Sequence, residues 1–489
     1  MPDRPDRLVR VAPYLLAAAL AVAVREALVQ RSGGIGGNYG YDSGVYYGAA
    51  AALIHGRVPY VEFTLLHPPA IMLVLTPSAL LGHVTSDHVG FASANLLFTA
   101  LGGVNAALVV LVARRWGLAR WAAFAGGAFY AVWLSAAAAE FSCRLEPLGN
   151  FFLLVGLAAI GRPSRRAALP LAGVALALAV STKIWFAVPL LVCGWLALRR
   201  AGAGGLRRYL LGVAATLMVV DGPFLVLSRG VMFARVVVDQ LGRHPQNVSP
   251  AYRWMLLSGA GRLFSTASTP GRLAAALGLL LAAAVVVIAA RSPRTRPFAV
   301  LAGAQLALLM VAPSWFGFYA DFAAVPVALC VAAAARCRPS VRLPALLALA
   351  GAAATTAVAV ADGAVRATLP WRNEASVIAA ARPFRCVIAD APGGLIEVDK
   401  LDSDLSRGCP NWIDVTGHTY YGADATRGRH RIRDLRWQHD LVAYLRSGQA
   451  ALVLRGRGDG LTRGSRAVLA RGGVLARGGS EVLYDVPPS

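Results

Sequence analysis

Long apolar runs recur along most of this chain, and they constrain its fold more than any other feature. About eleven runs of roughly 20 mostly apolar residues, the length that crosses a bilayer as a helix, are centred near residues 18, 100, 129, 155, 175, 191, 218, 281, 304, 329 and 352. Of all residues, 57% are hydrophobic and only 15% are charged, a balance far more apolar than that of soluble domains. The sequence therefore predicts an α-helical polytopic membrane protein, in which the first run (residues 11–24) is an uncleaved anchor.

The net charge of +23 comes largely from arginines in short clusters between the apolar runs. Basic residues concentrate in the cytoplasmic loops of membrane proteins, so topology explains the charge and no nucleic acid partner is expected. If every cluster is cytoplasmic, the N-terminus lies inside and the C-terminus outside. This alternation of inner and outer loops requires that residues 71–81 do not span the membrane. An apolar run of only about a dozen residues is typical of an interfacial or re-entrant helix.

The composition divides the chain into two predicted domains. Residues 1–361 contain the apolar runs, with two long outer loops at 30–87 and 229–272, and a long loop is uncommon unless it covers a site. Residues 362–489 are mixed and polar, and we expect a small extracytoplasmic α/β domain there, with strands at 386–390, 451–454 and 481–484 and a helix at 437–445. Its two cysteines, Cys386 and Cys409, either pair in an oxidising exterior or remain buried free thiols. No internal repeat of the kind found in many transporters is visible.

The first long loop contains the first candidate catalytic residue, Asp42, which begins a short helix-like run. An ionised carboxylate at an outer water interface can accept a proton from a hydroxyl group. Tyr46, Tyr47 and His67 follow it as candidate substrate-binding residues. Asp is also a good N-cap residue, so capping of this helix is an alternative role for Asp42.

Three charges occur within seven residues of a predicted short outer loop, at Glu140, Arg144 and Glu146. Glu140 is a candidate substrate-binding residue. Charge at this position is costly unless it is solvated or paired. Arg144 is suited to bind a phosphate in a bidentate manner, and Lys183, at a break between two apolar runs, is placed to meet a lipid phosphate. The alternatives are an arginine paired to either glutamate and a lysine that extends to the interface.

An aromatic turn near residue 319 forms the third predicted element. Tyr319 and Asp321 are candidate sugar-binding residues, because aromatic faces beside a carboxylate suit a sugar; the alternative is an interfacial aromatic belt. Asp221 is predicted to terminate a helix, and His244 in the second long loop is a weak candidate for ligand contact.

The motifs of these loops resemble those of one enzyme family. They are Asp42 with Tyr46-Tyr47, the stretch Gly56-Arg57-Val58-Pro59-Tyr60, His67-Pro68-Pro69, and Arg144-Leu145-Glu146-Pro147. Together with the layout of the whole chain, they resemble the GT-C superfamily of membrane glycosyltransferases, which includes the protein O-mannosyltransferase and lipid A aminoarabinose transferase families. The last motif is similar to the R-x-D-P found there, with Glu146 in place of the aspartate.

This resemblance implies an inverting transfer of a sugar, mannose or another hexose or pentose, from a polyprenyl-phosphate donor to an extracytoplasmic glycan, lipid or protein. It implies Asp42 as general base, Glu146 as a second catalytic acid, and Arg144 or Lys183 as the group that stabilises the leaving phosphate. No cofactor and no metal cluster are expected, although Asp42 and Glu146 could share a divalent ion. The richness in Ala, Gly and Arg suggests a bacterial plasma membrane. A lipid-linked sugar flippase or transporter is the alternative function, but it would need polar residues along the spans.

Overall fold

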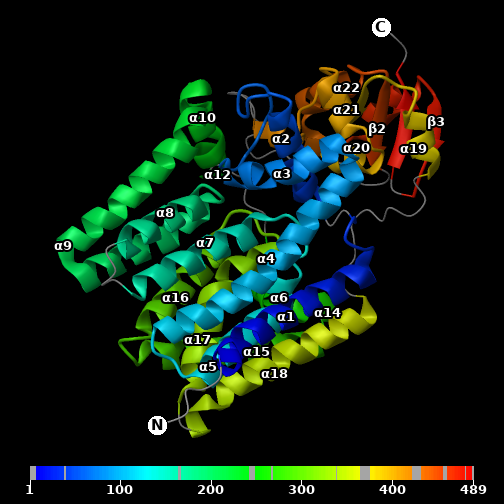
Figure 1. Cartoon of the computed structure of the whole chain (residues 1–489). Coiled ribbons are helices and arrows are strands. Elements are labelled where there is room, and N and C mark those ends of the chain that lie inside the picture. Colours follow the sequence, from blue (N-terminus) through cyan, green and yellow to red (C-terminus); the bar gives the residue numbers. More distant parts are fainter. Residues whose placement is uncertain are drawn as a thin grey trace. The chain divides into compact units, whose positions relative to one another are not determined.

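The computed structural model describes residues 7–37, 40–162, 167–241, 248–265, 268–337, 339–363, 375–420, 431–454, 460–479 and 481–486. The chain forms two compact units, each built from separate stretches of sequence (Figure 1). Unit 1 comprises Met1–Ser32, Leu97–Asp221 and Pro245–Val365. Unit 2 comprises Gly33–Leu96, Gly222–His244 and Arg366–Ser489. The first long loop thus belongs to the same unit as the C-terminal residues.

Unit 1 is a bundle of helices. Its elements are α1 (Arg7–Ser32), α4 (Asp87–Arg115, whose first residues belong to unit 2), α5 (Arg120–Val132), α6 (Leu134–Ala137), α7 (Leu145–Ile160), α8 (Ala168–Val180), η1 (Ile184–Phe186), α9 (Ala187–Val220), α13 (Pro250–Leu257), α14 (Ala260–Leu263), α15 (Thr269–Ala290), α16 (Arg296–Val311), η3 (Gly317–Ala323), α17 (Ala324–Ala335) and α18 (Pro339–Asp362). Every predicted apolar run lies in one of these helices. Six segments of the described chain are long and apolar enough to cross a membrane, so the chain is a multi-pass membrane protein. The number of spans and the orientation remain predictions.

Helix α9 folds back on itself and accounts for two of the predicted runs. Gly202 has non-helical dihedral angles (φ 64°, ψ −167°) in the middle of it. The hydroxyl of Tyr209 donates a hydrogen bond of 2.8 Å to the carbonyl of Leu190. In a straight helix, 19 residues would separate these groups by about 28 Å. Gly202 is therefore the turn of a helical hairpin, and α9 ends at Asp221, as the sequence predicts.

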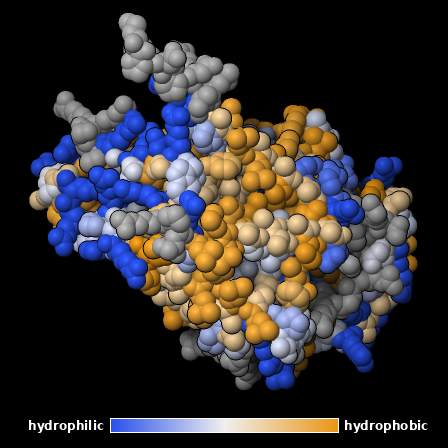
Figure 2. Space-filling model, turned by 90° about the horizontal axis from the view of Figure 1, so that it is seen from below, coloured by the Kyte–Doolittle hydropathy of each residue, from blue (hydrophilic) through white to orange (hydrophobic). Residues whose placement is uncertain are grey.

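The outward faces of the unit 1 helices are apolar. Large hydrophobic side chains that are exposed in the structure include Leu15, Leu16, Leu191, Met218, Leu273, Leu280 and Val311. Figure 2 shows hydrophobic side chains gathered on one face of the molecule. Such a surface is expected where lipid tails replace water as the solvent.

Unit 2 contains the helices of the first long loop, α2 (Tyr41–Ile54) and α3 (Ala70–Val84). It also contains α10 (Gly222–Leu227), α11 (Val231–Phe233), η2 (Ala234–Val238) and α12 (Asp239–Leu241) from the second long loop. Helix α3 has 15 residues, or about 22 Å of length, which is shorter than the ~30 Å hydrocarbon core. That length fits the prediction that residues 71–81 do not span. His244 lies outside the described residues.

The C-terminal part of unit 2 has an α/β fold. A four-stranded sheet has the order β1-β2-β4-β3, in which β1 (Val387–Ala389) and β2 (Ala450–Leu454) are parallel, while β4 (Glu481–Asp485) is antiparallel to β2 and to β3 (Val474–Arg477). The helical elements are α19 (Ala375–Ala381), α20 (Pro392–Glu397), α21 (Leu401–Ser406), η4 (Gly417–Tyr420), η5 (Arg431–Arg433), α22 (Leu435–Leu445) and α23 (Arg463–Ala470). The three predicted strands and the predicted helix are present. The predicted boundary at residue 361 stays a prediction, because residues 364–374 lie outside the described ranges.

Helix α2 packs tightly on this α/β part. A Cβ atom on Gly44 would lie 2.8 Å from the backbone nitrogen of Gly393, so only glycine allows this approach. The guanidinium of Arg57 donates to the carbonyl of Cys409 at 2.7 Å, and Cys409 forms a disulfide with Cys386. The pairing alternative for the two cysteines is therefore confirmed, and the disulfide lies next to the loop that contains Asp42.

Candidate active-site residues

Glu140 belongs to a buried polar network in unit 1. One carboxylate oxygen accepts hydrogen bonds from Arg25, including one of 2.8 Å from its Nε atom. The other oxygen accepts from the hydroxyl of Tyr130 at 2.6 Å and from the amide of Asn105 at 3.1 Å. Arg25 and Glu140 are both fully buried. Arg25 also donates to the carbonyls of Ala21 and Ala131, so this network joins α1, α4, α5 and the segment that follows α6.

Glu146 lies in the first turn of α7 and forms a second buried ion pair. The ammonium group of Lys183 lies 2.5 Å from one of its carboxylate oxygens. The same ammonium lies 3.8 Å from the ring centre of Tyr319 and 4.0 Å from that of Trp185, which are cation–π distances. The second oxygen of Glu146 has no hydrogen-bond partner among the described residues. Glu146 therefore keeps an unused acceptor atom.

Asp321 lies in η3 and is fully buried. Its backbone carbonyl accepts a 2.7 Å hydrogen bond from the amide of Asn150. Neither of its carboxylate oxygens has a hydrogen-bond partner in the described part of the chain. Asp321 also lies within electrostatic reach of Glu140 and Glu146. A buried carboxylate with unused acceptors is costly, which marks it as a group that a ligand could satisfy.

Arg144 lies at the N-cap of α7, with its guanidinium 4.1 Å from the ring centre of Phe318. A second cation, Arg262 of α14, is close enough for the two positive charges to interact. Burial, followed by the charge of Arg144, lowers the pKa of Arg262 to about 10. Arg262 therefore remains protonated at neutral pH, and the two guanidinium groups form a candidate binding place for an anion. The sequence analysis missed Arg262, because this arginine lies more than 100 positions after Arg144 in the chain.

A large apolar cavity lies in the same unit. It has a volume of about 1060 Å³ and is lined by residues of α13, α15 and α16, among them Trp254, Leu279, Val286, Leu306 and Met310. Its lining is suited to hydrocarbon rather than to a polar ligand. An apolar cavity is thus present in the unit that contains the two arginines.

Asp42 belongs to unit 2 and is half-buried in the first turn of α2. The N-cap position is occupied by Gly40, so the alternative interpretation of Asp42 as the N-cap is wrong. A carboxylate in the first turn still interacts favourably with the helix dipole. The buried Asp414, which the sequence analysis missed, is its neighbour. Burial raises the pKa of Asp414, and the negative charge of Asp42 raises it further.

Asp414 is held by polar groups from the first and the last stretch of unit 2. Its carboxylate accepts hydrogen bonds from the hydroxyl of Tyr41 at 3.1 Å and from the backbone nitrogen of Gly417 at 2.8 Å. Nearby, Nδ1 of His418 lies 3.0 Å from the hydroxyl of Thr64. Burial lowers the pKa of His418 to about 4. The imidazole is therefore neutral at physiological pH, and it contributes a hydrogen bond between the first loop and the C-terminal part.

The three predicted substrate-binding residues near Asp42 have packing roles in unit 2. The ring of Tyr46 makes an edge contact with His67 at 5.7 Å between ring centres. Tyr47 packs against Phe91 at 5.6 Å and is 1% exposed. We infer that Tyr47 fixes α2 against α4, while Tyr46 and His67 lie together in the loop that contains Asp42.

The structure therefore brings the predicted residues together in two groups. Unit 1 contains Glu140, Arg144, Glu146, Lys183, Tyr319 and Asp321, whereas unit 2 contains Asp42, Tyr46, Tyr47 and His67. The catalytic and binding roles of all these residues remain predictions. The sequence analysis missed Arg25, because this arginine lies just beyond the first apolar run and was not distinguished from the end of the span.

The sequence matches no protein-family profile, and it matches no curated protein. Solved structures do match. ArnT from Cupriavidus metallidurans bound to undecaprenyl phosphate is 16% identical with a TM-score of 0.61, covering 99% of this chain and 99% of that chain. The apo oligosaccharyltransferase of Archaeoglobus fulgidus is 14% identical with a TM-score of 0.56, covering 92% of this chain and 70% of that chain.

A third similar structure is AglB of Archaeoglobus fulgidus with an inhibitory peptide and a dolichol-phosphate. It is 13% identical, with a TM-score of 0.53, and the match covers 91% of this chain and 70% of that chain. These identities are low, but the match to ArnT extends over nearly the whole of both chains. The chain therefore has the fold of these membrane glycosyltransferases, which is the fold that its resemblance to the GT-C superfamily predicts.

Proposed function

We propose that this protein is a membrane glycosyltransferase that moves a sugar from a polyprenyl-phosphate donor to an acceptor outside the cytoplasm. The observation that carries the proposal is the fold shared with ArnT over 99% of both chains, in a structure that contains undecaprenyl phosphate. AglB was solved with a dolichol-phosphate, a carrier of the same chemical class. The sugar is a hexose or pentose, and the acceptor is a glycan, a lipid or a protein.

In this proposal, an acceptor hydroxyl attacks the anomeric carbon of the donor from the face opposite the phosphate. The new C–O bond forms as the bond to the phosphate oxygen breaks, so the configuration inverts. The hydroxyl proton passes to the carboxylate of Asp42, and the lipid phosphate leaves with the electron pair of the broken bond. Transfer of a proton to a positioned base contributes roughly 10² to 10⁴ in rate.

The leaving phosphate requires positive charge, and we assign this role to cationic side chains of unit 1. Arg144, Arg262 and Lys183 are the candidate groups, because charge-assisted hydrogen bonds to phosphate are strong where water is excluded. The apolar cavity of about 1060 Å³ in the same unit would accommodate part of the polyprenyl chain. Glu146 and Asp321 have unused acceptor atoms, so they are the acids that we expect to bind hydroxyl groups of a sugar.

The proposed location is a bacterial plasma membrane, with unit 2 on the outer side. The disulfide between Cys386 and Cys409 supports this orientation, because disulfides persist in oxidising compartments. The arginine clusters between the apolar runs support it independently, since they assign those loops to the cytoplasm.

The first experiment measures release of sugar from a panel of polyprenyl-phosphate sugars by the purified protein in detergent. We expect turnover with at least one donor, and we expect Asp42→Asn to reduce it by roughly 10² or more in a protein that still elutes as a folded species. Glu62→Gln is the matched control, because Glu62 is an exposed acid of the same loop, and it should retain wild-type turnover.

Two results would contradict the proposal at different levels. Full activity of Asp42→Asn would remove Asp42 as the base but leave the transferase intact. Absence of turnover with every donor, in a protein that binds those donors, would favour the lipid-linked sugar transporter instead.

A further inference from the structure

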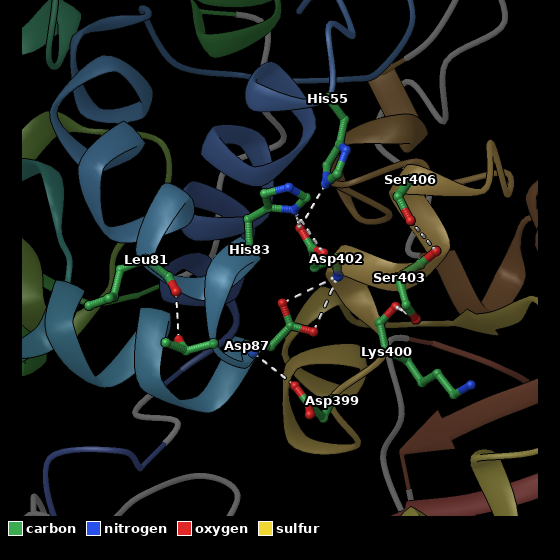
Figure 3. Close-up of polar contacts among 10 residues, drawn as sticks. His55, Leu81, His83, Asp87, Asp399, Lys400, Asp402, Ser403 and Ser406 are labelled. Atoms are coloured by element: carbon green, nitrogen blue, oxygen red, sulfur yellow. Dashed lines mark hydrogen bonds and ion pairs between the residues drawn. The ribbon is translucent and has the colours of Figure 1, made fainter.

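Two histidines and an aspartate converge in unit 2, away from the residues discussed above. His55 follows the last turn of α2, His83 lies in the last turn of α3, and Asp402 lies in the first turn of α21. Figure 3 shows the two imidazole rings directed at the Asp402 carboxylate. Nε2 of His55 lies 2.7 Å from Oδ1 of Asp402, and Nδ1 of His83 lies 3.1 Å from the same oxygen. All three ligand atoms lie within 4.8 Å of one another.

The backbone around Asp402 is fixed by two further carboxylates. The carboxylate of Asp87 accepts from the backbone nitrogen of Asp402, with both oxygens at 3.2 Å. The backbone nitrogen of Asp87 donates in turn to Asp399 at 2.8 Å (Figure 3). The position of Asp402 therefore does not depend on its contacts with the histidines, and the cluster is held by the fold around it.

The donor set is that of a late transition metal. Two imidazole nitrogens and one carboxylate oxygen suit Zn²⁺, whereas Mg²⁺ and Ca²⁺ prefer oxygen ligands alone. A tetrahedral zinc ion with bonds of 2.0 to 2.1 Å places its ligand atoms about 3.3 Å apart. Two of the contacts, at 2.7 and 3.1 Å, are therefore close to that spacing, and the shorter one would have to open by about half an ångström.

Exposure determines how the coordination would be completed. The side chain of His55 is 12% exposed, that of Asp402 21% and that of His83 48%. Water can therefore reach the site from the side of His83 and supply the fourth ligand. We propose that His55, His83 and Asp402 bind one Zn²⁺ ion. The sequence analysis expected no metal, because Asp402 lies more than 300 positions after both histidines in the chain.

Such an ion would tie three elements together. It would join the C-terminal ends of α2 and α3 to α21, and α2 is the helix that contains Asp42. Binding of a metal by the folded state alone stabilises that state, so zinc should stabilise unit 2. This inference does not depend on the proposed transferase activity, because zinc binding is measured without any sugar donor.

The test measures zinc bound to the full-length protein, purified in detergent without a polyhistidine tag and stripped with a chelator. After dialysis against buffered Zn²⁺, we expect one ion per wild-type chain by mass spectrometry of the metal. His83→Ala and Asp402→Asn should each weaken the affinity at least about tenfold, measured by competition with a chromophoric chelator. Zinc should also raise the melting temperature of the wild type and not that of these variants.

His439→Ala is the matched control. His439 lies 3.3 Å from Asp440, and both side chains are exposed, so this pair resembles half of the proposed site. The control should bind zinc as the wild type does. His83 is half exposed, so His83→Ala should fold, and size-exclusion chromatography checks this. Absence of retained zinc in the wild type, or equal affinity in His83→Ala and Asp402→Asn, would overturn the proposal and leave only a set of His–Asp hydrogen bonds.

Discussion

Two buried ion pairs in unit 1 differ in how completely their carboxylates are used. In the pair of Arg25 and Glu140, both oxygens of Glu140 accept hydrogen bonds from Arg25, Tyr130 and Asn105. In the pair of Lys183 and Glu146, one oxygen of Glu146 has no hydrogen-bond partner among the described residues. The nearby Asp321 has two such oxygens.

This difference in hydrogen bonding distinguishes Glu140, which we interpret as a structural residue, from Glu146 and Asp321, which are candidate ligand-binding residues. The desolvation cost of a buried ion pair is offset only where the remaining lone pairs of the carboxylate also accept hydrogen bonds. This condition is met at Glu140. Unused acceptors at Glu146 and Asp321 leave part of the desolvation cost uncompensated, and a ligand with hydroxyl groups would compensate it. Contact of Glu140 with substrate stays a prediction, but its acceptor atoms are already occupied.

Removal of the Glu140 carboxylate is the strongest test of this comparison. We expect Glu140→Ala to destabilise the bundle by about 3 to 5 kcal/mol, because the guanidinium of Arg25 would remain buried without its counter-ion. Unfolding in detergent, followed by the loss of helical circular dichroism with added denaturant, measures the effect.

The matched control for Glu140→Ala removes both charges together. The double variant Arg25→Met with Glu140→Leu leaves no unpaired charge at this position, so it should recover most of the lost stability. If Glu140→Ala were as stable as the wild type, the network would not be the structural element that its geometry indicates.

Helix α4 contains a glycine that makes room for this network. A Cβ atom on Gly102 would lie 2.3 Å from Nε of Arg25 and 3.0 Å from Oε2 of Glu140. The guanidinium is held by several hydrogen bonds and cannot move aside freely. Gly102→Ala should therefore cost about 1 to 3 kcal/mol, measured in the same unfolding experiment.

Gly303 of α16 provides the comparison for Gly102. A Cβ atom there would meet nothing within 4 Å, so Gly303→Ala should leave the stability unchanged or raise it by up to about 1 kcal/mol. Equal effects at the two glycines would show that helix propensity, and not the close approach to Arg25, determines the cost.

The sequence predicted the helices of unit 1 well, because each apolar run alone is long enough to identify it. Three strands of the α/β part were also predicted, since each is short, apolar and bounded by turn residues. Strand β3 was missed because three of its four residues are exposed, and an edge strand without a buried face gives no apolar signal. The turn of the helical hairpin at Gly202 lies between two of the predicted apolar runs, so the sequence alone indicated two separate helices there.

The candidate site residues of the two units were only partly predictable from the sequence, for a physical reason. Local motifs identified Asp42, Arg144 and Glu146, because each lies within a short pattern of charged and aromatic residues. The partners Arg25 and Asp414 belong to distant segments, and only the fold shows which charges they approach. A single sequence therefore identified the charged groups but could not separate Glu140, whose acceptors are used, from Asp321, whose acceptors are not.

Asp321 gives the smallest expected change in stability and completes the comparison. Asp321→Asn keeps the shape of the side chain and changes a carboxyl group whose oxygens accept no hydrogen bond from the described residues, so the free energy of unfolding should change by less than about 1 kcal/mol, or rise. If Asp321 accepts a hydroxyl of the sugar, the same variant should lose roughly 10- to 100-fold in sugar transfer, which corresponds to the loss of one charged hydrogen bond. The two measurements belong on one preparation, because a loss of activity is informative only in a folded protein. Destabilisation of Asp321→Asn to the extent expected for Glu140→Ala would mean that both carboxyl groups are structural, and the distinction between Glu140 and Asp321 would then be lost.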